Sequence, residues 1–371
     1  MKHLEMHILQ SVPVTCLNRD DLGSPKTAFF GGIQRARVSS QSWKRAIREY
    51  AHEISPYFEG QRSRLIIEPI RDEFVKIGRD EESALKWAKE IAGSLATLDS
   101  ENEKKVKTIY FTSHAELEFL AKEYAAICKE KGDIPADDKK YKEKAKIRTK
   151  AAAKKIDSAV NKDAADLALF GRMVASDHSL TIEGAAMFNH PISTHKVDNE
   201  LDFFAAVDEW QKEGDSGAGM TGTLEFNSSV YYRFAALNLS MLEDQEHLAC
   251  MTQKERKKVV SAFVQATVEA VPGMTSTNSG RKNSMNGYAR PSFVLGIVRK
   301  EGHPIQFVNA FEEPVWPGAG RGIMKTSIER LKKEEETQNE IWKLNKHELA
   351  RSVIPERNID EFIEEMVRYV E

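Results

Sequence analysis

The sequence predicts an α+β fold whose elements follow the ferredoxin-like order of strand, helix, strand, strand, helix and strand. Short segments in which apolar residues alternate with other residues are typical of strands, and they surround two segments with helical apolar spacing. A long charged block from about residue 80 to 175 has helical spacing and follows the first helix, so it is predicted to be an insertion. RNA-recognition domains use the same order of elements, but an order of elements does not define a function.

The first strand is predicted over residues 3–9 and the first helix after residue 39. The apolar residues of the strand are Leu4, Met6 and Ile8, and the polar ones are His3, Glu5 and His7. This alternation is typical of a half-buried strand, so the polar side chains are expected on a partly exposed face. Ser39 or Ser40 is expected to cap the helix, because a hydroxyl can accept a first-turn amide hydrogen.

The later elements complete the ferredoxin-like order around the insertion. Strands are expected at 106–111, 180–188, 224–239 and 292–298, and helices at 80–98, 115–130, 255–271, 325–345 and 356–370. Residues 217–222 match the GxGxxG pattern of dinucleotide sites, but a strand rather than a helix follows them. We therefore interpret the glycines of 214–222 as a flexible loop.

Composition excludes several classes of protein. With 371 residues and 41% hydrophobic residues, the chain can bury a sizeable core. No apolar stretch approaches the ~20 residues of a membrane-spanning helix, and the first residues do not resemble a secretion signal. Cys16, Cys128 and Cys250 lie far apart, which argues against a disulfide framework. These features predict a cytoplasmic protein that does not bind membranes.

Charge is balanced over the whole chain but uneven along it. The net charge is −3, whereas residues 139–155 contain nine Lys or Arg and a single acid, Glu143. Such a segment can be a solvated helix face, but its density of positive charge also makes contact with a polyanion plausible.

Two groups of residues suggest metal binding, and we favour a structural interpretation of both. His3, Glu5 and His7 share a strand face, but no fourth ligand is visible. Asp20 and Asp21 could hold Mg²⁺ in a loop, or could stabilise a turn. Metalloprotease, Walker-type and paired-cysteine motifs are absent from the sequence. We therefore predict no catalytic residue, no metal site and no cofactor.

Two blocks of sequence are distinctive. Residues 16–26 read CLNRDDLGSPK and residues 30–48 read FGGIQRARVSSQSWKRAIR. The second block comprises 171–173, 193–198, 206–208, 225–226 and 231–233. Together these segments resemble the CasC family, the backbone subunit of the type I-E CRISPR surveillance complex called Cascade.

The resemblance implies a right-hand-like subunit with an RNA-recognition-like palm, a helical fingers insertion and a thumb loop. The implied boundaries are 1–58, 180–192 and 224–315 for the palm, 59–179 for the fingers, 193–223 for the thumb and 316–371 for C-terminal helices. Copies of such a subunit form a head-to-tail filament along the guide RNA, and each thumb folds over RNA held by a neighbour. The implied partners are guide RNA, further copies of the chain, other Cascade subunits and target DNA that pairs with the guide.

A subunit that accepts any guide must bind the RNA backbone rather than the base edges. The start of the first helix suits phosphate, because free amides and the helix dipole favour an anion there. Lys44 and Arg48 lie four residues apart and share one helix face. RNA contacts are therefore predicted from Arg19, Lys26, Ser39, Ser40, Gln41, Lys44 and Arg48. Further contacts are predicted from Arg172, Met173 as a wedge beside an unstacked base, Arg281, Lys282 and Arg290.

Two other functions remain open at this point. Related backbone subunits of type III complexes cut RNA with a loop aspartate, so Asp20 or Asp21 could serve a metal-dependent ribonuclease. A monomeric RNA-binding protein is the other alternative. The sequence favours a non-enzymatic subunit over both.

Overall fold

The computed structural model describes residues 1–132, 134–135, 137–156, 159–174, 178–207, 218–274, 286–318 and 320–371. The chain divides into two compact units. Unit 1 comprises Met1–Glu53, Met187–Leu237 and Val260–Tyr369, and unit 2 comprises Ile54–Ala186, Asn238–Val259 and Val370–Glu371.

Unit 1 is built on a sheet with the strand order β11-β10-β1-β9-β6, in which β10 is antiparallel to β1 and β11. These strands are β1 (His3–Thr15), β6 (Ala186–Phe188), β9 (Ala218–Asn238), β10 (Phe293–Arg299) and β11 (Glu348–Ile354). In this sheet β10, β1, β9 and β6 are neighbours in that order, and they correspond to the fourth, first, third and second strands of the ferredoxin-like order. This arrangement confirms the predicted order of elements and adds one edge strand, β11.

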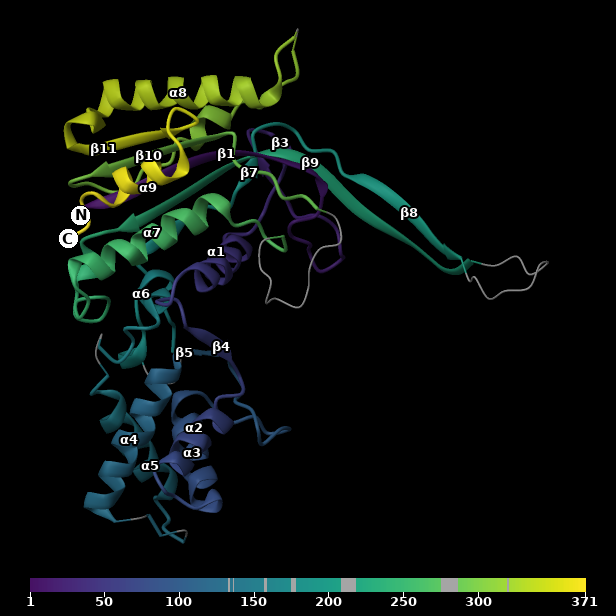
Figure 1. Cartoon of the computed structure of the whole chain (residues 1–371). Coiled ribbons are helices and arrows are strands. Elements are labelled where there is room, and N and C mark those ends of the chain that lie inside the picture. Colours follow the sequence, from purple (N-terminus) through teal and green to yellow (C-terminus); the bar gives the residue numbers. More distant parts are fainter. Residues whose placement is uncertain are drawn as a thin grey trace. The chain divides into compact units, whose positions relative to one another are not determined.

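Helices cover both faces of this sheet (Figure 1). On one face lies α8 (Ile323–Trp342), and on the other lie α1 (Ser40–Ile54), α7 (Gln253–Glu269) and α9 (Ile359–Val367). The core beneath α8 includes Leu9, Tyr232, Leu295, Phe307 and Leu331. On the opposite face, Gly296 lets α9 approach β10, because a Cβ atom there would lie 2.6 Å from the Phe362 ring.

The sheet is therefore closed to water on both sides, and the expected half-exposed strand over residues 3–9 is wrong. His3, Glu5 and His7 are as fully buried as their apolar neighbours. The ring of His7 stacks on Phe307 with centroids 4.2 Å apart. Alternation of residue types does not reveal which side of a strand a later segment of the chain will cover.

A long hairpin extends from the sheet of unit 1. It is formed by β8 (Glu200–Val207) and the first part of β9, paired from Glu200 with Phe226 to Val207 with Ala218. We call residues 200–207 and 218–226 the arm. Further along, β9 pairs with β7 (Ile192–Ser193). The segment predicted as a thumb loop thus contains paired strands, and β9 already begins inside the expected glycine loop.

A second, shorter hairpin joins β2 (Thr27–Phe30) to β3 (Ile33–Ala36). Gly31 and Gly32 have φ values of 59° and 76°. Such positive values are required by the two-residue turns that suit hairpins, and they explain the glycine pair.

Unit 2 is mainly helical and contains the whole of the predicted insertion 59–179. Its helices are α2 (Ile67–Lys76), α3 (Glu81–Leu95), α4 (His114–Lys131), α5 (Tyr141–Ala153) and α6 (Ala165–Phe170). The rings of Phe74, Trp87 and Tyr124 meet edge to face in its core. Asp80 and Ser113 cap α3 and α4 by accepting hydrogen bonds from backbone amides, which explains where these helices begin.

The remaining differences from the prediction concern short strands. The strand expected at 180–188 contracts to β6, after a 3-10 turn at His178–Leu180. The strand expected at 106–111 is β5 (Tyr110–Thr112), which pairs with β4 (Gln61–Ser63). The C-terminal region is not purely helical, because β11 lies between α8 and α9. Within the described residues, none of the helices has the length and apolar character needed to cross a bilayer.

Candidate nucleic-acid interface

The amino end of α1 has a defined set of hydrogen bonds. The Oγ atom of Ser39 accepts a bond from the Ser42 amide at 3.3 Å, so Ser39 is the cap. The Ser40 amide donates to Nδ1 of His190 at 3.0 Å. Gln41 is exposed in the first turn. The end of the helix is thus held by an imidazole that sequence reasoning did not identify.

Three cations gather around this imidazole. Burial and the charges of Arg37, Lys26 and Lys44 lower the pKa of His190. Since Nδ1 accepts the Ser40 hydrogen bond, the neutral ring carries its proton on Nε2. The charged groups that shift this pKa are all positive, so the surface attracts anions.

Short segments from three parts of unit 1 position these cations. The Arg37 amide donates to the Lys26 carbonyl at 2.9 Å, and its Nε atom donates to the Thr27 carbonyl at 3.3 Å. The Val38 amide donates to Pro191, which places His190 beside this segment. Backbone pairing thus brings residues 26–27, 37–38 and 190–191 together.

Lys44 and Arg48 extend the positive surface along α1. The Nζ atom of Lys44 lies 5.3 Å from the centre of the Phe188 ring, in the range of a cation–π contact. Arg45, which lies between them in sequence, forms an ion pair with Glu49 at 2.7 Å. Arg45 is an exposed cation on the same helix that was not predicted to contact RNA, so it serves as a control.

The loop before β2 is folded by its own polar groups. Arg19 donates to the Glu225 carbonyl at 3.1 Å, and its guanidinium lies 5.4 Å from the Phe226 ring at the base of the arm. Oδ1 of Asp20 accepts the amides of Leu22 and Ser24, both at 2.9 Å. These bonds confirm the turn-stabilising interpretation of Asp20. In the described ranges, no three His, Cys, Asp or Glu side chains are placed to hold a metal ion.

The other predicted contact residues have different surroundings or lie outside the described residues. Arg172 belongs to unit 2, where it is 5% exposed and binds Glu116 through two bonds of 2.7 Å. Its guanidinium thus holds protein segments together, so Arg172 is removed from the set of surface cations. Met173, its neighbour, is 81% exposed. Arg290 is paired with Glu269 at 2.9 Å, and Arg281 and Lys282 lie outside the described residues.

The structure thus adds Arg37 and His190 to the predicted set. Arg37 lies inside the distinctive segment 30–48, two residues before the helix cap Ser39. This position could have identified Arg37 as a further cation near the start of the helix. His190 is about 150 residues away in sequence, and only the pairing near β7 brings it to α1. No local pattern carries that information.

Fold and surface together define an α+β protein with a ferredoxin-like sheet, a helical insertion and an anion-attracting helix terminus. The sequence matches the CT1975-like protein family over residues 4–367, and the chain belongs to this family. The match confirms the resemblance to CasC-type CRISPR proteins.

Solved structures agree with this assignment. A chain described as "CRISPR RNA-guided surveillance complex, pre-nicking" is 27% identical, with a TM-score of 0.77 and full coverage of both chains. A second, described as "CRISPR RNA-guided surveillance complex", is 23% identical with a TM-score of 0.66 over 99% of each chain, and supports the fold. No curated protein matches the chain at a significant level.

Proposed function

We propose that this protein binds CRISPR guide RNA, independently of its sequence, as the repeated backbone subunit of a cytoplasmic type I-E Cascade complex. Target DNA then pairs with the bound guide, and other Cascade subunits complete the particle. The observation that carries the proposal is the gathering of Lys26, Arg37 and Lys44 around the amino end of α1. Similarity to chains from RNA-guided surveillance complexes supports it.

Contact with the RNA backbone follows from the chemistry of this surface. Lysine and arginine bind phosphate without reading bases, and the helix dipole favours an anion at the terminus, although the amides of Ser40 and Ser42 are already bonded within the protein. The polar groups of β1 cannot read bases from the sheet, because His3, Glu5 and His7 are buried. Exposed Met173 remains the proposed wedge beside an unstacked base.

Self-assembly is supported by the arm. Leu201 is 74% exposed and Phe203 is 66% exposed on one side of the arm, and Met220 is exposed on the other. A two-stranded ribbon is marginally stable in water, and exposed apolar residues at this density mark interaction surfaces. We propose that the arm packs on a neighbouring copy along the RNA, in a head-to-tail filament.

We also propose that the subunit is not an enzyme. The carboxylate of Asp20, one of the two residues considered for metal-dependent cleavage, accepts two backbone amides in a turn. No observation favours the ribonuclease alternative. Purified particles incubated with complementary RNA and Mg²⁺ should leave that RNA intact, and cleavage that is lost in Asp21→Ala would refute the proposal.

Replacing Lys44 and Arg48 together by alanine should weaken guide binding to a similar degree for unrelated guide sequences. For each phosphate contact that is lost, one counterion fewer is released when the RNA binds. The slope of log affinity against log salt should therefore become shallower by ~0.7 to 0.9 for each of the two contacts. The measurement is a salt titration of RNA binding. Arg45→Ala is the matched control and should leave the slope unchanged. Loss of affinity for only some guide sequences would contradict backbone recognition.

Replacing Leu201 and Phe203 by serine should prevent stepwise assembly while each chain remains folded. The exposed apolar area that a neighbour would cover is removed, whereas the cations at α1 are untouched. Native mass spectrometry on RNAs of increasing length measures the number of copies bound. Asp202→Ser, on the opposite side of the same strand, should still assemble. Full assembly of the double variant would show that the arm does not join copies.

A further inference from the structure

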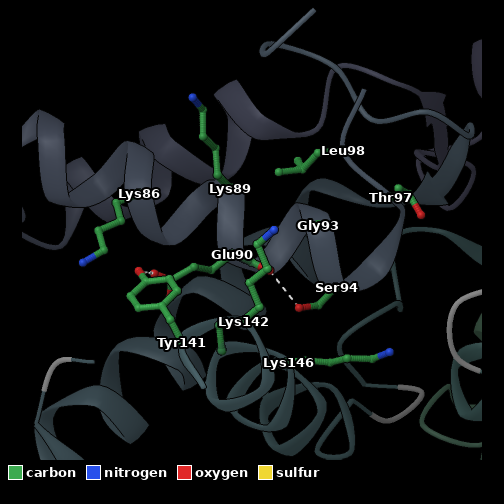
Figure 2. A pocket seen from close by; sticks show the side chains of 11 residues that line it. Lys86, Lys89, Glu90, Gly93, Ser94, Thr97, Leu98, Tyr141, Lys142 and Lys146 are labelled. Atoms are coloured by element: carbon green, nitrogen blue, oxygen red, sulfur yellow. Dashed lines mark hydrogen bonds between the residues drawn. The ribbon is translucent and has the colours of Figure 1, made fainter. Parts of the chain in front are cut away.

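A groove in unit 2 lies between α3 and α5 (Figure 2), whereas the cations proposed to bind RNA at α1 belong to unit 1. Its volume is about 610 Å³, within the range of ligand-binding cavities. The lining residues are Lys86, Lys89, Glu90, Gly93, Ser94, Thr97, Leu98, Tyr141, Lys142, Ala145 and Lys146. They recur at helical spacing on both helices, so the groove follows the contact between two regular elements.

The bottom of the groove is fixed by one carboxylate. Both oxygens of Glu90 accept hydroxyl hydrogens, one from Tyr124 and one from Tyr141. These bonds tie α5 to α3 and α4. Burial and hydrogen bonding to Glu90 raise the pKa of both tyrosines, so the hydroxyls keep their protons at neutral pH. The groove is therefore formed by helices that hydrogen bonds within unit 2 hold together.

Positively charged residues outnumber acidic residues around the groove. Four lysines line it, and Glu90 is the single acid among the lining residues. Lys89 is paired with Glu103 at 2.7 Å, and Lys86 lies 4.9 Å from the Tyr141 ring. Across the described part of the chain, no acidic side chain forms an ion pair with Lys142 or Lys146. The groove thus presents exposed cations that attract an anionic partner.

The walls between these cations are mostly apolar. Gly93 packs against Leu98, since a Cβ atom on Gly93 would lie 3.2 Å from the Leu98 Cγ atom, and Leu98 and Ala145 line the groove from the other segments. Two hydroxyls inside are already used, since the Ser94 hydroxyl donates to the Glu90 carbonyl at 2.8 Å and Tyr141 donates to the Glu90 carboxylate. A nucleobase would lose hydrogen bonds to water here without replacement, whereas an apolar side chain would not.

We propose that this groove binds an acidic, amphipathic segment of a partner protein. An apolar side chain of that segment would enter between Gly93, Leu98 and Ala145, and flanking carboxylates would meet Lys142 and Lys146. Charge complementarity selects acidic partners, and the apolar pocket distinguishes them from nucleic acid. The site is formed by unit 2 residues that take no part in the proposed RNA surface of unit 1, and it adds a protein contact to the subunit.

The test uses the purified full chain with its bound guide RNA. The probe is a fluorescein-labelled helical peptide with leucine on one face and glutamate on the others, and binding is measured by fluorescence anisotropy. Gly93→Leu displaces Leu98 by a few tenths of an ångström and fills the groove, while it improves helix propensity, so it should weaken binding by about tenfold or more. Lys142→Gln with Lys146→Gln should weaken binding similarly and reduce its dependence on salt.

The controls separate the proposal from general charge effects and from RNA binding. Lys144 lies on the same helix but is paired with Asp138, so Lys144→Gln should bind the peptide normally. The same peptide with lysine in place of glutamate should not bind. The guide content of the particle should be equal in all variants. Failure of the peptide to bind the wild type, or equal binding by Gly93→Leu, would overturn the proposal. Tighter binding of oligothymidylate, unaffected by Gly93→Leu, would show a plain polyanion surface instead.

Discussion

Replacing Arg172 by methionine should destabilise unit 2 by about 3–5 kcal/mol, the usual cost of removing one partner of a buried ion pair. Arg172 donates to both oxygens of Glu116 at 2.7 Å and to the carbonyls of Phe111 and Leu180 at 3.0 Å. Its guanidinium also lies 5.1 Å from the ring of Tyr110. Methionine fills similar space but leaves the Glu116 carboxylate buried without its cation.

Hydrogen exchange of the α4 amides is the suitable measurement, because it reports on unit 2 separately from the sheet. Met173→Ala is the matched control, since this neighbour is largely exposed and should change stability by less than about 0.5 kcal/mol. Replacing Glu116 by leucine in the Arg172→Met background should recover part of the loss, because the uncompensated charge is removed. Unchanged exchange in Arg172→Met combined with loss of guide RNA would instead return Arg172 to the RNA contacts.

Arg172 also shows where sequence reasoning stops. An arginine beside a methionine in a distinctive segment has the same local appearance whether it faces phosphate or a buried acid. The acid, Glu116, lies 56 residues earlier in the sequence. Nothing in the local pattern identifies it, because the pair forms only when Tyr110–Thr112 and the start of α4 meet the segment after α6.

Features that depend only on residues close in the sequence could be predicted. The Ser39 cap and the shared face of Lys44 and Arg48 depend on a few neighbouring residues. The strand order followed from periodicity together with the ferredoxin-like rule. In contrast, Arg37 and His190 meet Lys26 only through backbone pairing between distant segments. Burial of the polar face of β1 was missed for the same reason, since α8 and Phe307 come about 300 residues later.

The buried polar face of β1 is the basis of the second prediction, which concerns the stability of unit 1. Glu5 is fully buried and accepts hydrogen bonds from Arg299 at 3.1 Å and from the Ile305 amide at 3.0 Å, and it is bonded to His3 at 3.0 Å. Burial raises the pKa of Glu5, but hydrogen bonding to His3 and His7 and the charges of His7 and Arg299 outweigh this and hold the pKa well below its usual value. The ionised form therefore stabilises unit 1 and anchors the segment after β10 to the sheet.

Glu5→Gln should cost about 3–5 kcal/mol, because the side chain keeps its shape but leaves Arg299 as a buried charge without its acid. The depressed pKa also fixes the sign of the pH effect. The stabilisation is complete above the unfolded-state pKa of about 4.3 and is lost as pH falls from there toward the folded-state pKa. Urea unfolding of the wild type between neutral and acidic pH should therefore show a loss of stability that is smaller in Glu5→Gln. Glu348→Gln, which removes one acid from the partly exposed pair with Arg351, should cost less than about 1 kcal/mol. If Glu5→Gln unfolds like the wild type at neutral pH, the network is a consequence of the sheet being covered and does not hold the covering segment in place.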